Sequence, residues 1–188
     1  MKKIIFLPIL FTLLVVTGAH AGTLGVGFND YSVEVVLEQI LSRDERGSSL
    51  TIIEGIYNDR ENTKLFGAGL DVTGKVGNVP GLSIIAGIKG YYVSADVDDI
   101  AAGSLGGGFL YIVPGLHGLS IESTLYYCPK VFTFMDGIRM QDFGVRIAYA
   151  VAPRATVFIG YSNIRATVEI HGNQSLDETV RGGITLSF

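Results

Sequence analysis

The sequence contains no tryptophan and a single cysteine, Cys128, among its 188 residues. A small secreted domain held together by disulfides needs an even set of cysteines, so intramolecular bridges are excluded as the source of stability. Basic residues are also few, with 14 Lys and Arg against 18 Asp and Glu, and they form no basic stripe. Nucleic acid is therefore not an expected partner. No Cys and His cluster has the spacing of zinc ligands, and we predict no metal, cofactor or catalytic residue.

Long apolar runs are confined to the N-terminus. Two lysines precede an apolar segment over residues 4–16, which is followed by the small-x-small sequence Ala19-His20-Ala21. This pattern predicts a cleaved secretory signal peptide over residues 1–21 and one mature domain over residues 22–188. The apolar segment is too short for a membrane anchor, and no later run is long enough for a membrane-spanning helix. Cleavage would change the net charge from −4 to −6, because the peptide carries two lysines and no acid.

The rest of the chain alternates apolar and polar residues with a period of two, which is typical of β-strands. Tight turns of Gly, Pro and Asn and more polar connections separate the segments. Strands are expected at 22–28, 31–41, 48–58, 63–76, 81–94, 101–113, 118–130, 138–151, 154–169 and 178–188. Two of the polar connections, 129–136 and 171–177, are expected to be long. Short turns on one side and longer loops on the other are typical of bacterial outer-membrane barrels.

The number of strands follows from the closure of such a barrel, which requires an even antiparallel set. The count is ten if residues 22–28 form a separate strand that turns at Asn29-Asp30. We therefore expect an all-β protein, a closed antiparallel up-and-down transmembrane β-barrel of ten strands. A barrel of eight strands with a loose N-terminal segment is the alternative.

Alternation alone does not tell which strand face points inward. A soluble barrel or sandwich has apolar residues inside, whereas a membrane barrel has charges in its lumen. The polar face is rich in small residues such as Gly67, Gly69 and Gly144, which suits the crowded interior of a small barrel. Tyrosines also gather near the connections, as an interfacial girdle would. These features favour a membrane barrel over a soluble periplasmic barrel or sandwich that binds an apolar ligand. Strand 48–58 is ambiguous, because Glu54 shares a face with apolar residues.

Charges of both signs fall on the presumed lumen face, which favours ion pairing over an ion pathway of one sign. They are Glu34, Glu38, Asp71, Lys75, Lys89, Glu122, Asp142, Arg146 and Arg181. Folding the hairpin of strands 118–130 and 138–151 at its centre brings Glu122 opposite Arg146, and we predict an ion pair there. Asp71 and Lys89 are further candidates for lumen ion pairs. A small barrel lined in this way has little free lumen, so an open general porin is not expected.

The last ten residues, Thr179 to Phe188, form an amphipathic strand that ends on an aromatic residue. Ile184, Leu186 and Phe188 lie on its apolar face. A C-terminal strand of this form resembles the assembly signal that the insertion machinery of outer-membrane barrels reads. The expected partners are outer-membrane lipid and lipopolysaccharide, with the outer-membrane assembly machinery and periplasmic chaperones during biogenesis. The barrel is expected to be a monomer.

One cluster of polar residues raises the alternative of a lipid-modifying enzyme. His171, Ser175 and Glu178 lie close together beside the last long connection. Some small outer-membrane barrels are lipid A hydrolases or acyltransferases that use His and Ser at such places. The spacing here matches no such motif, so the expected function is non-catalytic.

Several segments together resemble the YfaZ-type outer-membrane proteins. They are GAGLDV at 67–72, GGGF at 106–109, VFIGYSNIRA at 157–166 and VRGGITLSF at 180–188. The resemblance runs over the whole mature chain and includes the signal peptide and the early short hairpin. It implies a barrel in the outer membrane of a Gram-negative bacterium and supplies no catalytic or binding residues. We expect a structural or interaction protein, or a narrow passive conduit for small solutes.

Overall fold

The computed structural model describes residues 21–95, 98–169 and 172–188, which are almost entirely β-strand. The expected signal peptide, residues 1–21, lies outside the described residues apart from Ala21. The wall strands are β1 (Gly22–Phe28), β2 (Ser32–Arg43), β3 (Gly47–Asn58), β4 (Thr63–Lys75), β5 (Leu82–Ser94), β6 (Asp99–Ile112), β7 (Leu119–Cys128), β9 (Gly137–Ala152), β10 (Ala155–Val168) and β11 (Gly172–Ser187). A short 3-10 turn, η1 (Lys130–Phe132), and a three-residue strand, β8 (Thr133–Met135), lie between β7 and β9. Over the described ranges, no helix is long and apolar enough to cross a membrane.

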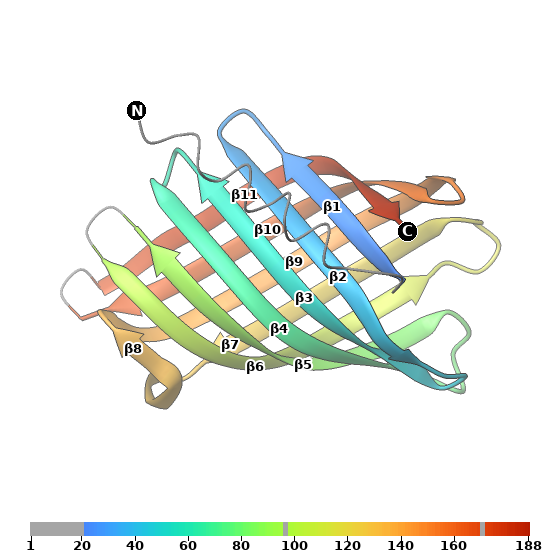
Figure 1. The fold of residues 1–188 in the computed structure, drawn as a ribbon, viewed down its shortest axis with the longest axis horizontal. Helices are drawn as coiled ribbons and strands as arrows, with labels where there is room; N and C mark the ends of the chain where they lie inside the picture. Colours follow the sequence, from blue (N-terminus) through green and yellow to red (C-terminus); the bar gives the residue numbers. More distant parts are fainter. Residues whose placement is uncertain (1–20, 96–97, 170–171) are drawn as a thin grey trace.

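The ten wall strands form a closed antiparallel barrel (Figure 1). β1 closes the ring by pairing with β11, from Thr23 opposite Ser187 to Phe28 opposite Gly182. β7 pairs with β9 directly, and β8 continues the pairing of β6 where β7 has ended. The expectation of ten strands is confirmed. The eight-strand alternative is wrong, because β1 is paired on both sides, with β2 and with β11.

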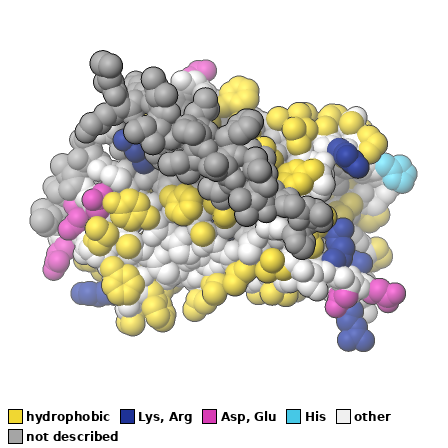
Figure 2. Space-filling view, viewed as in Figure 1, with side chains coloured by type: hydrophobic (Ala, Val, Ile, Leu, Met, Phe, Trp, Pro, Cys, Tyr) yellow, Lys and Arg dark blue, Asp and Glu magenta, His cyan; other side chains and the backbone are white. Residues whose placement is uncertain are grey.

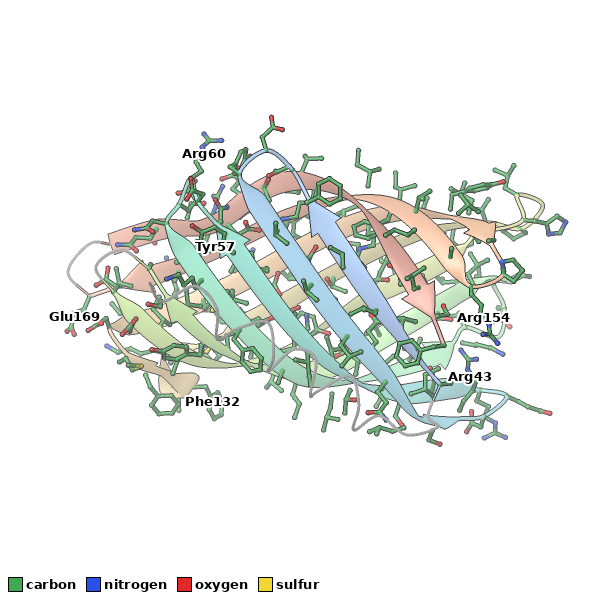
Figure 3. All side chains as sticks on the ribbon, turned by 45° about the horizontal axis from the view of Figure 1, so that its top comes forward. Arg43, Tyr57, Arg60, Phe132, Arg154 and Glu169 are labelled. Carbon is green, nitrogen blue, oxygen red and sulfur yellow. The ribbon has the colours of Figure 1, made fainter. Side chains whose placement is uncertain are left out.

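The connections define two ends of the barrel. The loop end holds residues 29–31, 59–62 and 129–136, together with Ala95, Asp98 and Glu169. The turn end holds residues 44–46, 76–81, 113–118 and 153–154. The first and last strands also begin and end at the turn end. Figure 3 shows Arg43 and Arg154 there, and Arg60 and Glu169 at the loop end.

The expected long loop at 171–177 is wrong. β11 begins at Gly172, and its residues from Asn173 to Ser175 already pair with β10. A bulge at Ile164/Arg165 shifts the register and lets the ladder continue through this polar stretch. Connections therefore do not sort by length between the two ends. Residues 129–136 form the long excursion that the sequence predicts between β7 and β9.

The two faces of the wall differ in chemistry in the sense expected for a membrane barrel. Large apolar side chains are exposed on the outside of every wall strand, among them Leu70 on β4, Ile88 on β5 and Ile159 on β10. Figure 2 shows hydrophobic side chains over the middle of the visible wall and charged side chains toward its two ends. Charged residues such as Asp71 and Arg181 are buried inside. The pattern is the reverse of that of a soluble barrel.

Glycines in the wall make room for large interior side chains. A Cβ atom at Gly106 on β6 would lie 2.6 Å from the Cα atom of Tyr126 on β7. A Cβ atom at Gly69 on β4 would lie 2.7 Å from the Cγ atom of Lys89 on β5. Both distances are too short for any side chain, so the Gly-rich segments of β4 and β6 are explained by packing in a narrow lumen.

Candidate functional site in the barrel lumen

The lumen has two layers. Its loop-end half is filled by an apolar cluster that includes Val93, Ile100, Cys128, Val168 and Leu176, none of them more than 1% exposed. These residues come from β5, β6, β7, β10 and β11, so the cluster spans the interior from wall to wall. We call it the apolar plug. Cys128 is a free thiol within it, and its Sγ atom lies 3.1 Å from Oγ1 of Thr133.

A buried polar network lies beside the apolar plug at the loop end. The Arg181 guanidinium donates from Nη1 to Oδ2 of Asp177 at 3.0 Å and from Nε to the Ser32 hydroxyl at 2.9 Å. The Asn58 amide donates to the other Asp177 oxygen at 2.8 Å. Arg181, Asp177, Asn58 and Ser32 are all buried. Because every charge has its partner, the network ties β11 to β2 and β3.

The loop-end turn 29–31 joins this network on the outside. The Asn29 amide donates to the hydroxyl of Thr179, and that hydroxyl donates to the phenol oxygen of Tyr31 at 3.1 Å. The hydrogen bond from Thr179 lowers the pKa of Tyr31, because it stabilises the phenolate form. The turn between β1 and β2 is therefore held against β11, the strand that closes the barrel by pairing with β1.

The middle of the lumen contains a polar cavity of about 100 Å³, which we call the acidic cavity. Its volume is enough for a few water molecules. Six carboxylates and two cations line it: Glu34, Glu38, Glu54, Asp71, Glu122 and Asp142 with Lys89 and Arg146. The excess of negative charge makes this cavity favourable for cations and unfavourable for anions.

Lys89 is the central cation of the acidic cavity. Its Nζ atom lies 3.4 Å from Oε2 of Glu54 and 3.8 Å from Oδ2 of Asp142. The same ammonium group lies 4.4 Å from the centroid of the Tyr126 ring, in cation–π range. Oε1 of Glu54 has no hydrogen-bond partner within the described part of the chain. One lysine therefore compensates two acids, and one carboxylate oxygen remains unsatisfied.

Arg146 is the second cation of the cavity. Glu122 lies directly opposite Arg146 in the β7–β9 register, as the hairpin alignment predicts. The ion pair formed by the guanidinium is with Glu34 of β2, across the lumen, at 3.8 Å. The guanidinium carbon also lies 4.4 Å from the centroid of the Phe158 ring. A direct Glu122–Arg146 ion pair stays a prediction, because the register brings the two residues together without fixing a contact between their charged atoms.

The other two ion-pair candidates lie in the cavity with different partners. Asp71 accepts hydrogen bonds from the hydroxyl of Tyr126, and Lys89 binds Glu54 and Asp142 as described. Sequence reasoning missed Glu54, since its face of β3 also carries apolar residues such as Ile52 and Ile56. That face points into the lumen. The one sequence feature that could have indicated this is the acidic residue on a strand face that is otherwise apolar.

The residues considered for catalysis do not form a site in the described residues. His171 lies outside them, and the Ser175 hydroxyl is buried without a hydrogen-bond partner there. Glu178 is on the outer face of β11, where it pairs with Arg165 at 3.0 Å. Nor do the described ranges hold a group of three or more His, Cys, Asp or Glu side chains placed for a metal ion.

The apolar row of the last strand lies on the outside of the barrel. Ile184, Leu186 and Phe188 are each between 41% and 49% exposed. The backbone amide of Phe188 donates to the carbonyl of Gly22 at 3.0 Å, and the amide of Gly22 donates to the carbonyl of Phe188 at 3.1 Å. The first and last wall residues are therefore joined at the turn end.

These features define a class: a small closed barrel of ten strands with an apolar exterior and a charged interior. Within that class, the chain belongs to the YfaZ family, whose model, described as "YfaZ precursor", matches residues 1–188. The membership expected from the sequence segments is thereby confirmed. No curated protein sequence matches the chain.

Solved structures of similar barrels have low sequence identity to this chain. A structure titled "KdgM porin in complex with disordered oligogalacturonate" is 12% identical, with a TM-score of 0.49, and the match covers 89% of this chain and 99% of that one. Another, titled "KdgM porin", is 14% identical, with a TM-score of 0.39 and the same coverage of both chains.

Proposed function

We propose that this protein is an outer-membrane β-barrel of structural or interaction type, without catalytic activity and closed to solute flow at its loop end. The observation that carries the membrane assignment is the inverted distribution of side chains. A soluble barrel with six carboxylates inside and large apolar residues all round its outside would lose the hydrophobic driving force for folding. The soluble alternative also requires an apolar ligand cavity, and the acidic cavity has the opposite chemistry.

The orientation follows from the two ends. The first and last wall strands end together at the turn end, where a chain arriving from the periplasm would leave its termini. The long excursion 129–136 lies at the loop end, which we place outside the cell. In this arrangement the row of Ile184, Leu186 and Phe188 on β11 is the surface that the assembly machinery and periplasmic chaperones would contact. The word "precursor" in the family description supports a cleaved signal peptide over residues 1–21.

The apolar plug supports the closed state. Water and ions would have to cross a region in which five side chains from five strands are almost completely buried. Hydrophobic constrictions of this kind exclude water from a pore. A steady conductance is therefore not expected, and the proposed role is structural or mediated by the outer surface.

The membrane assignment is tested by placing a charge on the outer wall. Ile159→Arg puts a guanidinium on the exposed face of β10 and should cost about 2–4 kcal/mol of folding free energy in lipid vesicles. The control Val151→Arg lies next to the turn end of β9 and should cost about 0–1 kcal/mol, because the penalty falls toward the membrane surface. Equal, negligible costs at both positions, with the wild type in the soluble periplasmic fraction, would contradict a membrane barrel.

The closed state is tested separately in planar bilayers. The folded protein, identified by its shifted gel mobility before boiling, should insert without giving steady single-channel currents. Steady open channels would show that the lumen conducts and would favour the narrow conduit over the structural role.

A further inference from the structure

The outer wall carries a groove across β2 to β6, with a volume of about 800 Å³. Its floor is a row of small residues, Ala68, Gly90 and Gly103, which are paired with one another in the ladder. The next outward row toward the turn end is large, with Leu70, Ile88 and Leu105 in the same pairing. The groove therefore exists because three adjacent strands lack bulky side chains at one height of the wall. Below, it is called the outer groove.

The excursion between β7 and β9 forms the rim of the outer groove. Phe132 of η1 lines the groove and stands over Gly103, where an added Cβ atom would lie 3.8 Å from the Cβ atom of Phe132. The Phe132 ring is half exposed and projects outward from the wall (Figure 3). The absence of a side chain at Gly103 thus leaves room for a ligand group beside the Phe132 ring.

Two exposed lysines lie near the outer groove without lining it. Lys64 is on the same face of β4 as Ala68 and four residues closer to the loop end, a distance of about 13 Å along a strand. Lys130 begins η1, two residues before Phe132. In the described ranges neither lysine forms an ion pair. The only acid within the excursion, Asp136, accepts a hydrogen bond from the backbone amide of Asp99 at 3.1 Å.

We propose that the outer groove binds an acyl chain of lipid A, the phosphorylated and multiply acylated anchor of lipopolysaccharide, and that Lys64 and Lys130 bind its phosphate groups. The inference rests on the proposed placement in the outer membrane with the loop end outward. The floor is apolar, one cation (Lys64) lies on its loop-end side, and a second (Lys130) lies beside its aromatic rim. This arrangement is complementary to an acyl chain whose anionic head lies on the loop-end side. A flexible chain also fills a linear groove of small residues better than a rigid side chain can.

The acyl-chain part of the proposal is tested by filling the outer groove. Gly90→Leu is compatible with the fold, because the nearest atom to an added Cβ is the Ala68 carbonyl oxygen at 3.8 Å. The matched control is Gly182→Leu on the outer face of β11, where the nearest atom is the Phe158 carbonyl oxygen at 3.9 Å. Purified lipid A is titrated against each barrel in detergent and followed by native mass spectrometry. Gly90→Leu should weaken binding about tenfold, the worth of about two buried methylene groups. Gly182→Leu should bind as the wild type does.

The headgroup part is tested with Lys64→Gln combined with Lys130→Gln. This pair should lose affinity for lipid A and show no further loss when the lipid is dephosphorylated, whereas the wild type should lose affinity on dephosphorylation. Lys75→Gln, a single exposed lysine at the turn end, is the control and should have no effect. Equal wild-type affinity for phosphatidylglycerol and lipid A would overturn the proposal, as would equal binding by Gly90→Leu and Gly182→Leu. A change of oligomeric state in Gly90→Leu alone would assign the groove to a second copy of the chain and would likewise overturn it.

A first assay common to all variants separates lipid A binding from membrane insertion. Each barrel is first assayed for the heat-dependent gel shift and for insertion into vesicles. A wild type that inserts but does not prefer lipid A contradicts the outer groove as a lipid A site. A wild type that does not insert contradicts the membrane assignment itself.

Discussion

Tyr126 on β7 donates its hydroxyl hydrogen to the carboxylate of Asp71 on β4, with distances of 2.7 Å to both oxygens. β5 and β6 separate these strands in the wall, and the register places Asp71, Gly87, Gly106 and Tyr126 in one row, so the hydrogen bond runs along the inner wall over the two glycines. Both residues are buried, and Gly87 and Gly106 leave the space that their side chains occupy. The pair thus bridges β5 and β6 along the inner wall at the edge of the acidic cavity.

Tyr126→Phe should lower the free energy of unfolding by about 1–3 kcal/mol. The substitution keeps the ring and removes only the donor, so the Asp71 carboxylate is left buried without this hydrogen bond. The measurement is urea unfolding of the barrel in lipid vesicles. Tyr127→Phe is the control, since Tyr127 is on the outer face and its hydroxyl has no hydrogen bond within the described ranges. Equal stabilities of the two variants would contradict a structural role for the Tyr126–Asp71 hydrogen bond.

Arg181→Leu should be far more damaging than Arg165→Leu. Both arginines pair with an acid of β11, but the Arg181 pair is 2% and 1% exposed, whereas the Arg165 pair is 58% and 43% exposed. Loss of Arg181 leaves Asp177 as a buried charge without its main partner, which should cost about 3–5 kcal/mol. Loss of Arg165 should cost about 0–1 kcal/mol, because water screens an exposed pair.

The same vesicle unfolding measurement compares the two variants. Arg181→Lys is a useful third variant, because it keeps the charge but cannot reproduce the forked contacts with Asp177 and Ser32. It should fall between the wild type and Arg181→Leu. Similar values for Arg181→Leu and Arg165→Leu would show that the loop-end network does not hold the barrel together.

Ten strands could be predicted because the strands show the period-two pattern. Closure of an antiparallel barrel also needs an even number of strands, and that number is reached only if Gly22–Phe28 is counted as one. The start of β11 could not be predicted. Residues 173–175 are polar on both faces at the exposed rim, and only their ladder with β10 shows that they are strand. Alternation likewise could not tell inside from outside, which depends on the solvent around the wall.

Pairing within the lumen was harder to predict than its lining. Parity identified Asp71, Lys89 and Arg146 as inward residues, and register brought Glu122 beside Arg146. Contacts across the lumen depend on barrel radius and strand tilt, which sequence spacing does not contain. The pairs Arg146–Glu34 and Lys89–Glu54 each join strands that are not neighbours in the wall, so no hairpin alignment could find them.

A double-mutant cycle tests whether Glu122 and Arg146 interact. Adjacent side chains on paired strands come close enough to couple, so the Glu122→Gln and Arg146→Gln cycle should show a favourable interaction of about 0.5–1 kcal/mol. The cycle with Glu34→Gln should give a larger value, because Glu34 lies at ion-pair distance. A coupling energy of zero between Glu122 and Arg146 would show that the predicted ion pair is not formed. Of the two acids tested, Glu34 alone would then pair with Arg146.

Weakening the apolar plug should produce a cation-selective pore. Ile100→Ala combined with Leu176→Ala removes bulk from two side chains of the plug, each 1% exposed or less, at a cost of about 2–5 kcal/mol per substitution. Ions that pass the opened plug must cross the acidic cavity, where carboxylates outnumber cations six to two. Cations should therefore carry the current, and the reversal potential in a potassium chloride gradient gives the selectivity.

Two sets of variants complete the experiment. Adding Glu54→Gln and Glu122→Gln to the opened barrel should reduce the preference for cations, because the acidic cavity loses two of its six acids. Ile88→Ala combined with Leu105→Ala removes similar bulk from the outer face and should leave the barrel closed. Anion-selective or unselective currents through the opened barrel would contradict an acidic cavity on the ion path, and a silent opened barrel would place the constriction elsewhere in the lumen.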